Sequence, residues 1–362
     1  MGVEEELLLV DPDTGILKPV SDHAIRLQDC DDSAYDLEQE LFLQQIETAT
    51  EPCSGLDDLT TNLQMARRTA VDAVRAAGAE AVAMPVPVIG DHQAQVTPKA
   101  RYQQMLGNYG EIGRRAVVCG MHVHVDVESD DEAVGVVDHI RPWLPLLMAA
   151  AANSPFYDGD DTGHASWRSN IWDRWPSAGP TEPFGSVQAY RRAVDQMVAS
   201  GAALDEAMVY FDVRLAVSYP TVELRVADVC TDLDTVVLVA ALSRALVETA
   251  ARSWSTVMQL VPWRVDLLRS ARWRASHDGL SDQLLNPATL RLVPARAAFD
   301  SLLEHVGPAL DESGDAAYVT ALIDKLFTHG TGADRQRAVA GHAFDLAAVV
   351  EDLRARTAAS LD

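Results

Sequence analysis

Four short segments of the chain alternate between aliphatic side chains and side chains that bind metals or anions. Because successive residues of a β-strand point to opposite faces, this period of two predicts strands with one aliphatic and one polar face. An antiparallel sheet with one solvated face often alternates in this way. Here, however, the polar positions hold His, Glu, Asp and Arg in all four segments, which favours a functional face. The segments are GVEEELLLV (2–10), CGMHVHVDVE (119–128), YFDVRLAVS (210–218) and TVELRVAD (221–228).

The first of these segments places three carboxylates in a row. As a strand, it has Glu4 and Glu6 on one face, about 7 Å apart, and Glu5 on the other. Two carboxylates at that spacing repel each other unless water or a cation lies between them. Taken alone, the segment is more typical of a frayed, solvated strand start, so the interpretation as a cation site depends on matching carboxylates elsewhere in the chain.

The residue types on the polar faces indicate a class of chemistry. Carboxylate oxygens are the preferred ligands of Mg²⁺ and Mn²⁺, and Mn²⁺ and Zn²⁺ also accept imidazole. Arginines beside such a site suit phosphate or carboxylate recognition. The chain has no G-x-x-x-x-G-K-[ST] motif and no Gly-Lys pair, which excludes a P-loop nucleotide site. The combination predicts phosphoryl transfer with Mg²⁺ or Mn²⁺ on an open sheet.

Charge and composition exclude several other classes of protein. The 362 residues carry 54 acids against 29 bases, a formal net charge of −25, which opposes nucleic acids and anionic membranes but suits divalent cations. The four cysteines are widely spaced without a CxxC pair, and no signal-peptide pattern opens the chain, so we expect reduced thiols and a cytoplasmic location. The most apolar run, 236–251, contains Ser243 and Arg244 and predicts a buried helix.

Periodicity along the rest of the chain predicts an α+β fold without regular βα alternation. One long connection, 153–185, is rich in Gly, Pro, Asp and Trp, and loops of that length are usually functional. Its tryptophans, Trp167, Trp172 and Trp175, are expected to pack the loop. The predicted helices are 56–78, 131–152 with an interruption at its two prolines, 187–208, 234–260 and most of 296–362 with breaks at 307–308 and 330–334. The predicted strands are 3–10, 80–89, 117–128, 209–217 and 221–229.

Together, these motifs resemble the carboxylate–amine ligases, the second family of glutamate–cysteine ligases, whose fold is related to glutamine synthetase. The resemblance spans nearly the whole chain, and one departure is AMPV at 83–86, where relatives have GTHP, which predicts a different wall of the pocket. The matching stretches are GVEEELLLVD (2–11), ELFLQQIETATEPC (40–53), CGMHVHVDV (119–127), ANSPFYDGDDTGHASWRSNIW (152–172), FDVRLAVSYPTVELRVAD (211–228), RWRASHDGL (272–280) and GTGADRQR (330–337).

The resemblance implies a fold and a set of site residues. The fold would be a six-stranded, mostly antiparallel sheet curled into a half-barrel, or funnel, with helices on the outer face. It would form a single catalytic domain over 1–362, with 153–185 as an active-site loop and a mostly helical part at 281–362. The implied metal ligands are Glu4, Glu6, Glu40, Glu47, His122 and Glu223. Catalysis would involve Glu223 and Arg225, substrate binding Arg168, His124 and Arg214, and ATP binding Arg225, Arg272 and Arg335.

Within this set, Arg225 matches the arginine that faces the transferred phosphate, and Arg168 matches the one that grips the carboxylate of the amino-acid substrate. Two alternatives stay open. Glu40 and Glu47, seven residues apart, also fit one solvated face of a helix. Arg272, together with Arg274, is equally consistent with a position on the surface.

The implied activity is an ATP-dependent ligase that joins the γ-carboxylate of glutamate to cysteine through an acyl phosphate, with ATP and Mg²⁺ or Mn²⁺ as cofactors. A ligase of the same fold with another acid or amine is the first alternative. A metal-dependent hydrolase and a non-catalytic metal or metabolite-binding protein are the others. The expected partners are small-molecule substrates, not nucleic acid or membrane. The oligomeric state is left open, a homo-oligomer included.

Overall fold

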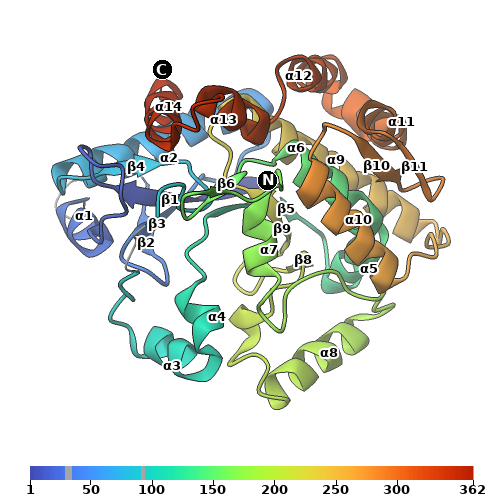
Figure 1. Cartoon of the computed structure of the whole chain (residues 1–362). Helices are drawn as coiled ribbons and strands as arrows, with labels where there is room; N and C mark the ends of the chain where they lie inside the picture. The colour runs from blue at the N-terminus through green and yellow to red at the C-terminus, as the bar shows by residue number, and fades with distance from the viewer. Residues whose placement is uncertain (29–34, 91–93, 362) are drawn as a thin grey trace.

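A computed structural model describes residues 1–28, 35–90 and 94–361 of the chain. Its centre is an open antiparallel sheet with strand order β2-β3-β1-β5-β9-β8, and β4 pairs with the end of β1 (Figure 1). The strands are β1 (Gly2–Val10), β2 (Leu37–Gln39), β3 (Gln45–Ala49), β4 (Glu80–Val82), β5 (Gly120–Asp126), β8 (Val213–Leu215) and β9 (Thr221–Asp228). Every pairing in this sheet is antiparallel, as predicted, but it has seven strands rather than six.

The extra strand is explained by how β1 is shared. β5 pairs with residues 2–5 of β1, and the three-residue strand β4 pairs with residues 8–10, further along β1. Only 80–82 of the predicted strand 80–89 is therefore a strand. Among the described residues no pairing joins the edge strands β2 and β8, so the sheet is not closed.

The register of the sheet brings the polar positions of separate strands side by side. Glu4 pairs with His122, and Glu6 pairs with Glu47. On the next strands, Glu223 lies opposite both His124 and Arg214. Directly opposite residues in an antiparallel pair project from the same face. One face of the sheet therefore collects the carboxylates, histidines and arginines that the alternation predicted.

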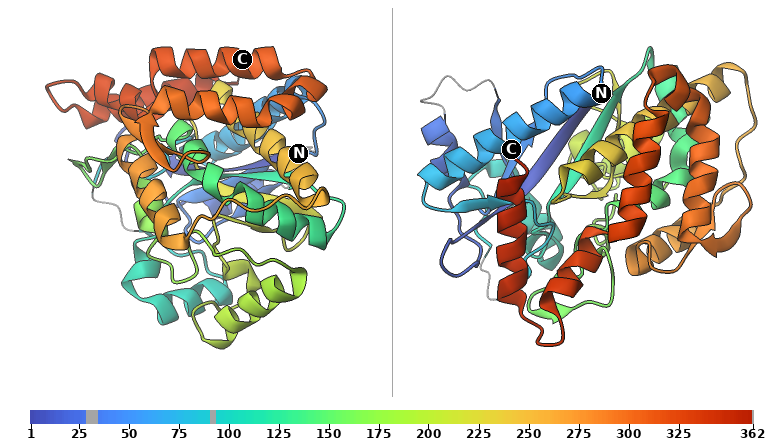
Figure 2. Two further views of the ribbon diagram at one scale, coloured as in Figure 1. Left: turned by 90° about the vertical axis from the view of Figure 1, so that its right-hand side faces the viewer. Right: turned by 90° about the horizontal axis from the view of Figure 1, so that it is seen from above.

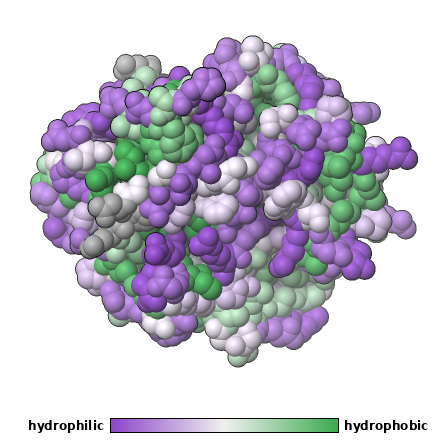
Figure 3. Space-filling model, viewed as in Figure 1, coloured by the Kyte–Doolittle hydropathy of each residue, from purple (hydrophilic) through white to green (hydrophobic). Residues whose placement is uncertain are grey.

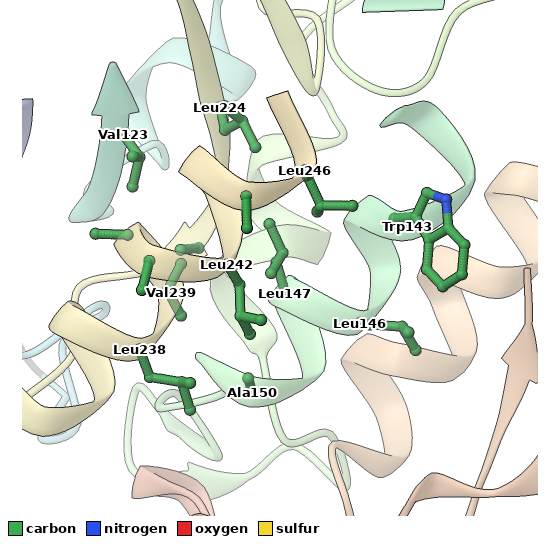
Figure 4. Close-up of a cluster of buried hydrophobic side chains, with 14 of the residues drawn as sticks. Val123, Trp143, Leu146, Leu147, Ala150, Leu224, Leu238, Val239, Leu242 and Leu246 are labelled. Carbon is green, nitrogen blue, oxygen red and sulfur yellow. The ribbon is translucent and has the colours of Figure 1, made fainter. Parts of the chain in front are cut away.

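The opposite face of the sheet is aliphatic and packs against helices. Val123 of β5 and Leu224 of β9 belong to the same buried core cluster as Leu242 and Leu246 of α9 (Figure 4). Helices α2, α5 and α6 complete this layer. Burying these side chains yields about 25 cal/mol for each Å² of apolar surface, so this packing orders the strands that carry the polar face.

The helices follow much of the predicted periodicity. Figures 1 and 2 show α12, α13 and α14 on one side of the sheet, with α3, α4 and α8 on the other. The longer helices are α1 (Ser21–Gln28), α2 (Leu56–Ala76), α3 (Ala100–Tyr109), α5 (Asp130–Ile140), α8 (Val187–Ala199), α9 (Leu233–Ser255), α10 (Val265–Asp278), α11 (Ala295–Ser313), α12 (Ala316–His329), α13 (Gly332–Ala340) and α14 (Leu346–Ala359). The shorter ones are α4 (Glu111–Arg114), η1 (Arg141–Trp143), α6 (Leu144–Ala150), α7 (Trp167–Trp172) and η2 (Glu206–Met208).

Three helix predictions are wrong in their detail. The helix expected over 234–260 is α9, which ends at Ser255. The helix expected over 187–208 ends at Ala199, because Gly201 adopts a positive φ of 77° that ends the helical path. The break expected at 307–308 does not occur, since α11 runs through Pro308. Val306 and Leu310 are buried against the core there, and this packing offsets the hydrogen bond that proline cannot donate.

Glu5 points into the helical layer, away from Glu4 and Glu6. Its carboxylate accepts two hydrogen bonds from Arg67 of α2, at 2.7 Å from Nε and 2.6 Å from Nη2, and both side chains are buried. Arg67 also donates to the carbonyls of Cys230 and Thr231. The predicted division of the three glutamates between two faces is confirmed, and Glu5 forms a structural ion pair.

The 153–185 segment contains a short hairpin, β6 (Phe156–Tyr157) and β7 (Asp160–Asp161), followed by α7. It is fastened to the end of β9, because Asp228 accepts hydrogen bonds from the hydroxyls of Ser154 (2.7 Å) and Ser166 (2.8 Å). Gln336 of α13 donates to the backbone carbonyl of Asn153 at 2.6 Å. The GTGADRQR motif thus braces the beginning of this segment.

The surface agrees with the acidic composition. The face in Figure 3 is mostly hydrophilic, with hydrophobic groups in separate patches. No helix among the described residues is both long and apolar enough to cross a membrane. Cys53, Cys119 and Cys230 are free and buried, whereas Cys30 lies outside the described residues.

A second hairpin, β10 (Gln283–Asn286) and β11 (Arg291–Pro294), precedes α11.

Candidate active site

A cavity of about 380 Å³ opens on the polar face of the sheet. Strands β1, β2, β3, β5, β8 and β9 supply its floor, while α3, the end of α7 and the 207–219 region supply its walls. The predicted site residues that line it are Glu4, Glu6, Glu40, Glu47, His122, His124, Arg214, Glu223 and Arg225. The sheet therefore gathers most of the predicted site into one place.

Among the residues that the structure describes, two groups of potential metal ligands lie in this cavity, and they share one histidine. The first is Glu4, His122 and Glu223, and the second is Glu6, Glu47 and His122. Within each group, one ligand atom from every residue lies within 4.8 Å of the others. The Nε2 atom of His122 is buried and, in the part of the chain that the structure describes, has no hydrogen-bond partner. Carboxylates with one imidazole suit Mg²⁺ or Mn²⁺, so these residues fit a divalent cation.

Glu40 does not belong to either group, but it lies beside the second. It follows directly after β2, and Glu47 lies within β3. The alternative in which these two residues share a solvated helix face is therefore wrong. A short strand, a turn and a second strand, which put Glu47 across from Glu6, replace that helix.

The carboxyls in the cavity carry opposite pKa shifts. Burial raises the pKa of Glu40 from 4.5 to about 7, helped by the charge of Glu6. Burial, with the charges of Glu40, Glu4 and Glu6, raises the pKa of Glu47 well above its usual value. Burial acts in the same direction on Glu4, but hydrogen bonds and charges from His122 and His124 outweigh it and lower the pKa. Like charges held together at this density are relieved by a cation.

This crowding predicts a pH-dependent stability in the metal-free protein. Between pH 4.5 and about 7, folded Glu40 keeps a proton that the unfolded chain has released. The folded state binds more protons, so this carboxyl makes the free energy of unfolding fall as the pH rises. His122, whose pKa burial and Arg225 lower to about 4, contributes with the opposite sign. The contribution of Glu40 to the unfolding free energy must therefore be isolated by comparing the wild type with a variant that lacks this carboxyl.

After chelation, Glu40→Gln is expected to gain about 1–3 kcal/mol in unfolding free energy relative to the wild type between pH 4.5 and 7. Urea unfolding at several pH values measures this difference. A difference that stays constant or shrinks as the pH rises would show that Glu40 does not carry a raised pKa.

Glu223 also connects the metal ligands to two arginines. Its carboxylate accepts hydrogen bonds from Arg214 Nε at 2.7 Å and from Arg225 Nη1. Burial and the charge of Arg214 lower the pKa of Arg225 to about 10, so the guanidinium stays charged near neutral pH. The Arg225 guanidinium lies 5.9 Å from the ring of Trp172 and 5.8 Å from that of Tyr210. A buried, charged guanidinium thus faces the cavity beside the cation ligands.

Arg168, Arg272 and Arg335 do not line the cavity. Arg168 is buried against Gly120 at the start of β5, where a Cβ atom would lie 2.0 Å from its Nη2. Arg272 pairs with Asp173 and with Asp212, at 3.2 Å from the latter. Arg335 pairs with Asp232 and lines a separate cavity among α2, α9, α12 and α14. Their contacts with substrates stay predictions.

The AMPV segment does not form a wall of the cavity. Ala83, Met84 and Val86 are buried in the core, and none of the residues 83–86 lines the cavity. The chain turns inward after the short β4, and the Ala83 amide donates to the hydroxyl of Thr357 at 3.1 Å. The prediction of an altered pocket wall is wrong.

Several lining residues were not anticipated. Trp172 and Trp175, expected only to pack the loop, contact each other and Tyr210 at the edge of the cavity. The other unanticipated lining residues are Glu38, Leu41, Gln45, Arg101, Tyr102, Met105, Ala116, Val118, Ala207, Tyr210 and the turn 216–219. Glu38 and Glu40 are two residues apart, and this spacing was the available signal for a strand. A strand of three residues is too short, however, to show a period.

Comparison with known proteins assigns the chain to a class of enzyme, the ligases, through its family. Residues 1–350 match the model of glutamate–cysteine ligase family 2, and the chain belongs to this family. It is 46% identical over 365 residues to the Streptomyces coelicolor protein named "Putative glutamate–cysteine ligase 2", with 99% of each chain covered. It is also 46% identical over 368 residues to "Putative glutamate–cysteine ligase 2-1" of Nocardioides, covering 99% of this chain and 96% of the relative.

Solved structures show the same fold at low sequence identity. A glutamate–cysteine ligase from Francisella tularensis in complex with AMP has a TM-score of 0.69 and 14% identity, with 99% of this chain and 92% of the other covered. A bifunctional glutathione synthetase from Pasteurella multocida has a TM-score of 0.68 and 18% identity, covering 98% of this chain and 52% of the other.

Proposed function

We propose that this protein is an ATP-dependent ligase that joins the γ-carboxylate of L-glutamate to the amine of L-cysteine. The observation that carries the proposal is the pair of carboxylate–histidine groups that share His122, next to Arg225 in one cavity. Family membership supports it as well. The Francisella structure, a complex with AMP, supports an adenine nucleotide as co-substrate.

The reaction follows from the chemistry of the two substrates. A γ-carboxylate oxygen of glutamate attacks the γ-phosphorus of ATP, the bond to the bridging oxygen breaks, and ADP leaves. The amine nitrogen of cysteine then attacks the acyl carbon of the resulting acyl phosphate. The carbon–oxygen bond breaks, the nitrogen loses a proton, and phosphate leaves with the oxygen that came from glutamate.

The chain's own residues position the reactants and balance charge. Arg225 would stabilise the negative charge on the moving phosphoryl group, and Glu223 holds its guanidinium in place. Glu4, Glu6, Glu47, His122 and Glu223 would hold the cations, with Glu40 beside them. When bound, divalent cations neutralise phosphate oxygens and orient the nucleotide.

We also infer that the sheet curls around this cavity as a half-barrel and that residues 1–362 form one catalytic domain. The cavity's lining from both edges of the sheet supports the curl. The buried free thiols of Cys53, Cys119 and Cys230 support a reducing, cytoplasmic compartment. Glutathione biosynthesis would be the corresponding pathway.

An ADP-release screen tests the proposed function. Glutamate with cysteine, in the presence of ATP and Mg²⁺, is expected to release ADP, and either substrate alone is not. Chelation with EDTA is expected to abolish the release, and Mg²⁺ or Mn²⁺ to restore it. Release that persists after exhaustive chelation would contradict the metal assignment. Release that needs no amine would contradict the ligase, and a protein that leaves ATP unused would favour the metal-dependent hydrolase.

The same screen, extended to a panel of other amines and acids, separates the proposal from its nearest alternative. A ligase that prefers another pair of substrates would release ADP most rapidly with that pair. The residues assigned to phosphoryl transfer would stay the same, because all such substrates react through a carboxylate and an amine.

A further inference from the structure

Within the described part of the chain, three guanidinium groups line the cavity, and two of them are bound to one of the potential metal ligands. Arg214 and Arg225 both donate to Glu223. The third, Arg101, lies on α3 and lines the cavity from that helix. Its carboxylate partner is Asp205, which belongs to neither group of potential metal ligands. Arg101 is therefore the lining guanidinium that the metal and phosphate chemistry leaves unused.

The contacts of Arg101 orient its guanidinium without using all of its hydrogen-bond donors. Asp205 accepts from Nε and Nη2, both at 2.9 Å, and Arg101 Nη1 approaches the sulfur of Met105 at 3.5 Å. A guanidinium has five N–H groups, so donors remain for an anion in the cavity. The side chain is 39% exposed, which leaves it accessible from the mouth. Because Asp205 fixes the group beforehand, little side-chain entropy is lost on binding.

An amino-acid substrate brings a carboxylate that does not react and that needs such a partner. The residue expected to grip it, Arg168, is 2% exposed and lies outside the cavity. We propose that Arg101 binds the α-carboxylate of an amino-acid substrate through charge-assisted hydrogen bonds. This assignment rests on the proposed function. Both substrates of that reaction carry an α-carboxylate, and the experiment below separates them.

Arg101 could have a purely structural role instead. Its ion pair with Asp205 joins α3 to the beginning of η2. If that were its whole role, removing the guanidinium would lower the melting temperature and change every kinetic constant together. A substrate contact would instead raise one KM selectively, and only for a substrate that possesses the carboxylate.

The experiment compares Arg101→Gln with wild type and with two other variants. Arg114→Gln is the matched control, since Arg114 lies nearby on α4, is exposed, pairs with Glu111 and does not line the cavity. Arg168→Gln tests the competing residue. KM is measured for ATP, glutamate and cysteine. Each amino acid is compared with an analogue that lacks the α-carboxylate, 4-aminobutyrate for glutamate and cysteamine for cysteine, assayed as a substrate or as a competitive inhibitor.

We expect Arg101→Gln to raise the KM of one amino acid by about ten- to a hundredfold. The constants for ATP and for the analogue of that amino acid should change little. A KM that rises for glutamate but not for 4-aminobutyrate assigns the contact to the acid substrate. A KM that rises for cysteine but not for cysteamine assigns it to the amine substrate.

Three results would overturn the assignment. In the first, Arg101→Gln behaves like Arg114→Gln or weakens amino acid and analogue equally. In the second, Arg168→Gln alone shows the selective pattern. In the third, wild type releases no ADP with any acid and amine, which refutes the proposed function and this assignment with it. An active wild type with unaffected Arg101→Gln refutes the assignment alone.

Discussion

Replacing Glu6 or Glu223 with glutamine is expected to lower kcat by at least about a hundredfold without unfolding the protein. An amide oxygen is a neutral and weaker ligand for a hard cation than a carboxylate. Glu6 also lies among like charges, since it contributes to the raised pKa of both Glu40 and Glu47. Removing its charge should therefore leave the metal-free protein at least as stable as wild type. Steady-state kinetics and thermal melting with and without Mg²⁺ measure both effects.

Glu5→Gln is the matched control for this prediction, because it makes the same chemical change one residue away. Glu5 lies on the helical face, bound to Arg67, so kcat per folded molecule should be nearly unchanged. Stability should fall instead, by about 3–5 kcal/mol, because the buried Arg67 loses its charged partner. A loss of kcat in folded Glu5→Gln that matched the loss in Glu6→Gln would contradict the placement of the metal ligands.

Arg225→Lys is expected to lower kcat by about a hundredfold while changing the KM values of ATP and glutamate little. The proposed partner of Arg225 is charge that develops on the phosphoryl group in the transition state, so its loss affects the rate rather than ground-state binding. A lysine keeps the charge but cannot reproduce the planar fork that reaches Glu223 and a phosphate oxygen together.

Arg214→Lys provides the contrast, because Arg214 binds the same carboxylate and also the backbone carbonyls of Ala207 and Val209. As a predicted substrate-binding residue, it should alter KM more than kcat. If Arg225→Lys left kcat unchanged, or raised only KM, the proposal that Arg225 stabilises the transferred phosphoryl group would be wrong.

The strands of the site could be predicted where they are long enough to show a period. β1, β5 and β9 each have several alternating residues, and the predicted faces match the burial of Glu5 and the register of Glu4 with His122. β2 has three residues and β3 has five, so neither gave a usable period, and only the resemblance indicated Glu40 and Glu47.

The rest of the site depends on packing between distant segments, which leaves no local pattern. Arg101 reaches the cavity because α3 is joined to Asp205, about a hundred residues further along the chain. Arg335 belongs to a matching motif, yet its neighbour Gln336 shows that the motif braces Asn153 from outside the cavity. Membership of a matching motif predicted a role for Arg335 but not which surface it occupies, and no motif pointed to Arg101.

Transfer of an oxygen atom from substrate to phosphate tests the central claim most directly. Glutamate labelled with ¹⁸O in both oxygens of its γ-carboxylate is incubated with ATP, Mg²⁺ and cysteine, and the released phosphate is analysed by mass spectrometry. An acyl phosphate intermediate requires each phosphate to leave with one oxygen from that carboxylate, so we predict one ¹⁸O atom per phosphate, released only when the amine is present. Phosphate that carries no label, or that forms equally well without cysteine, would contradict the account.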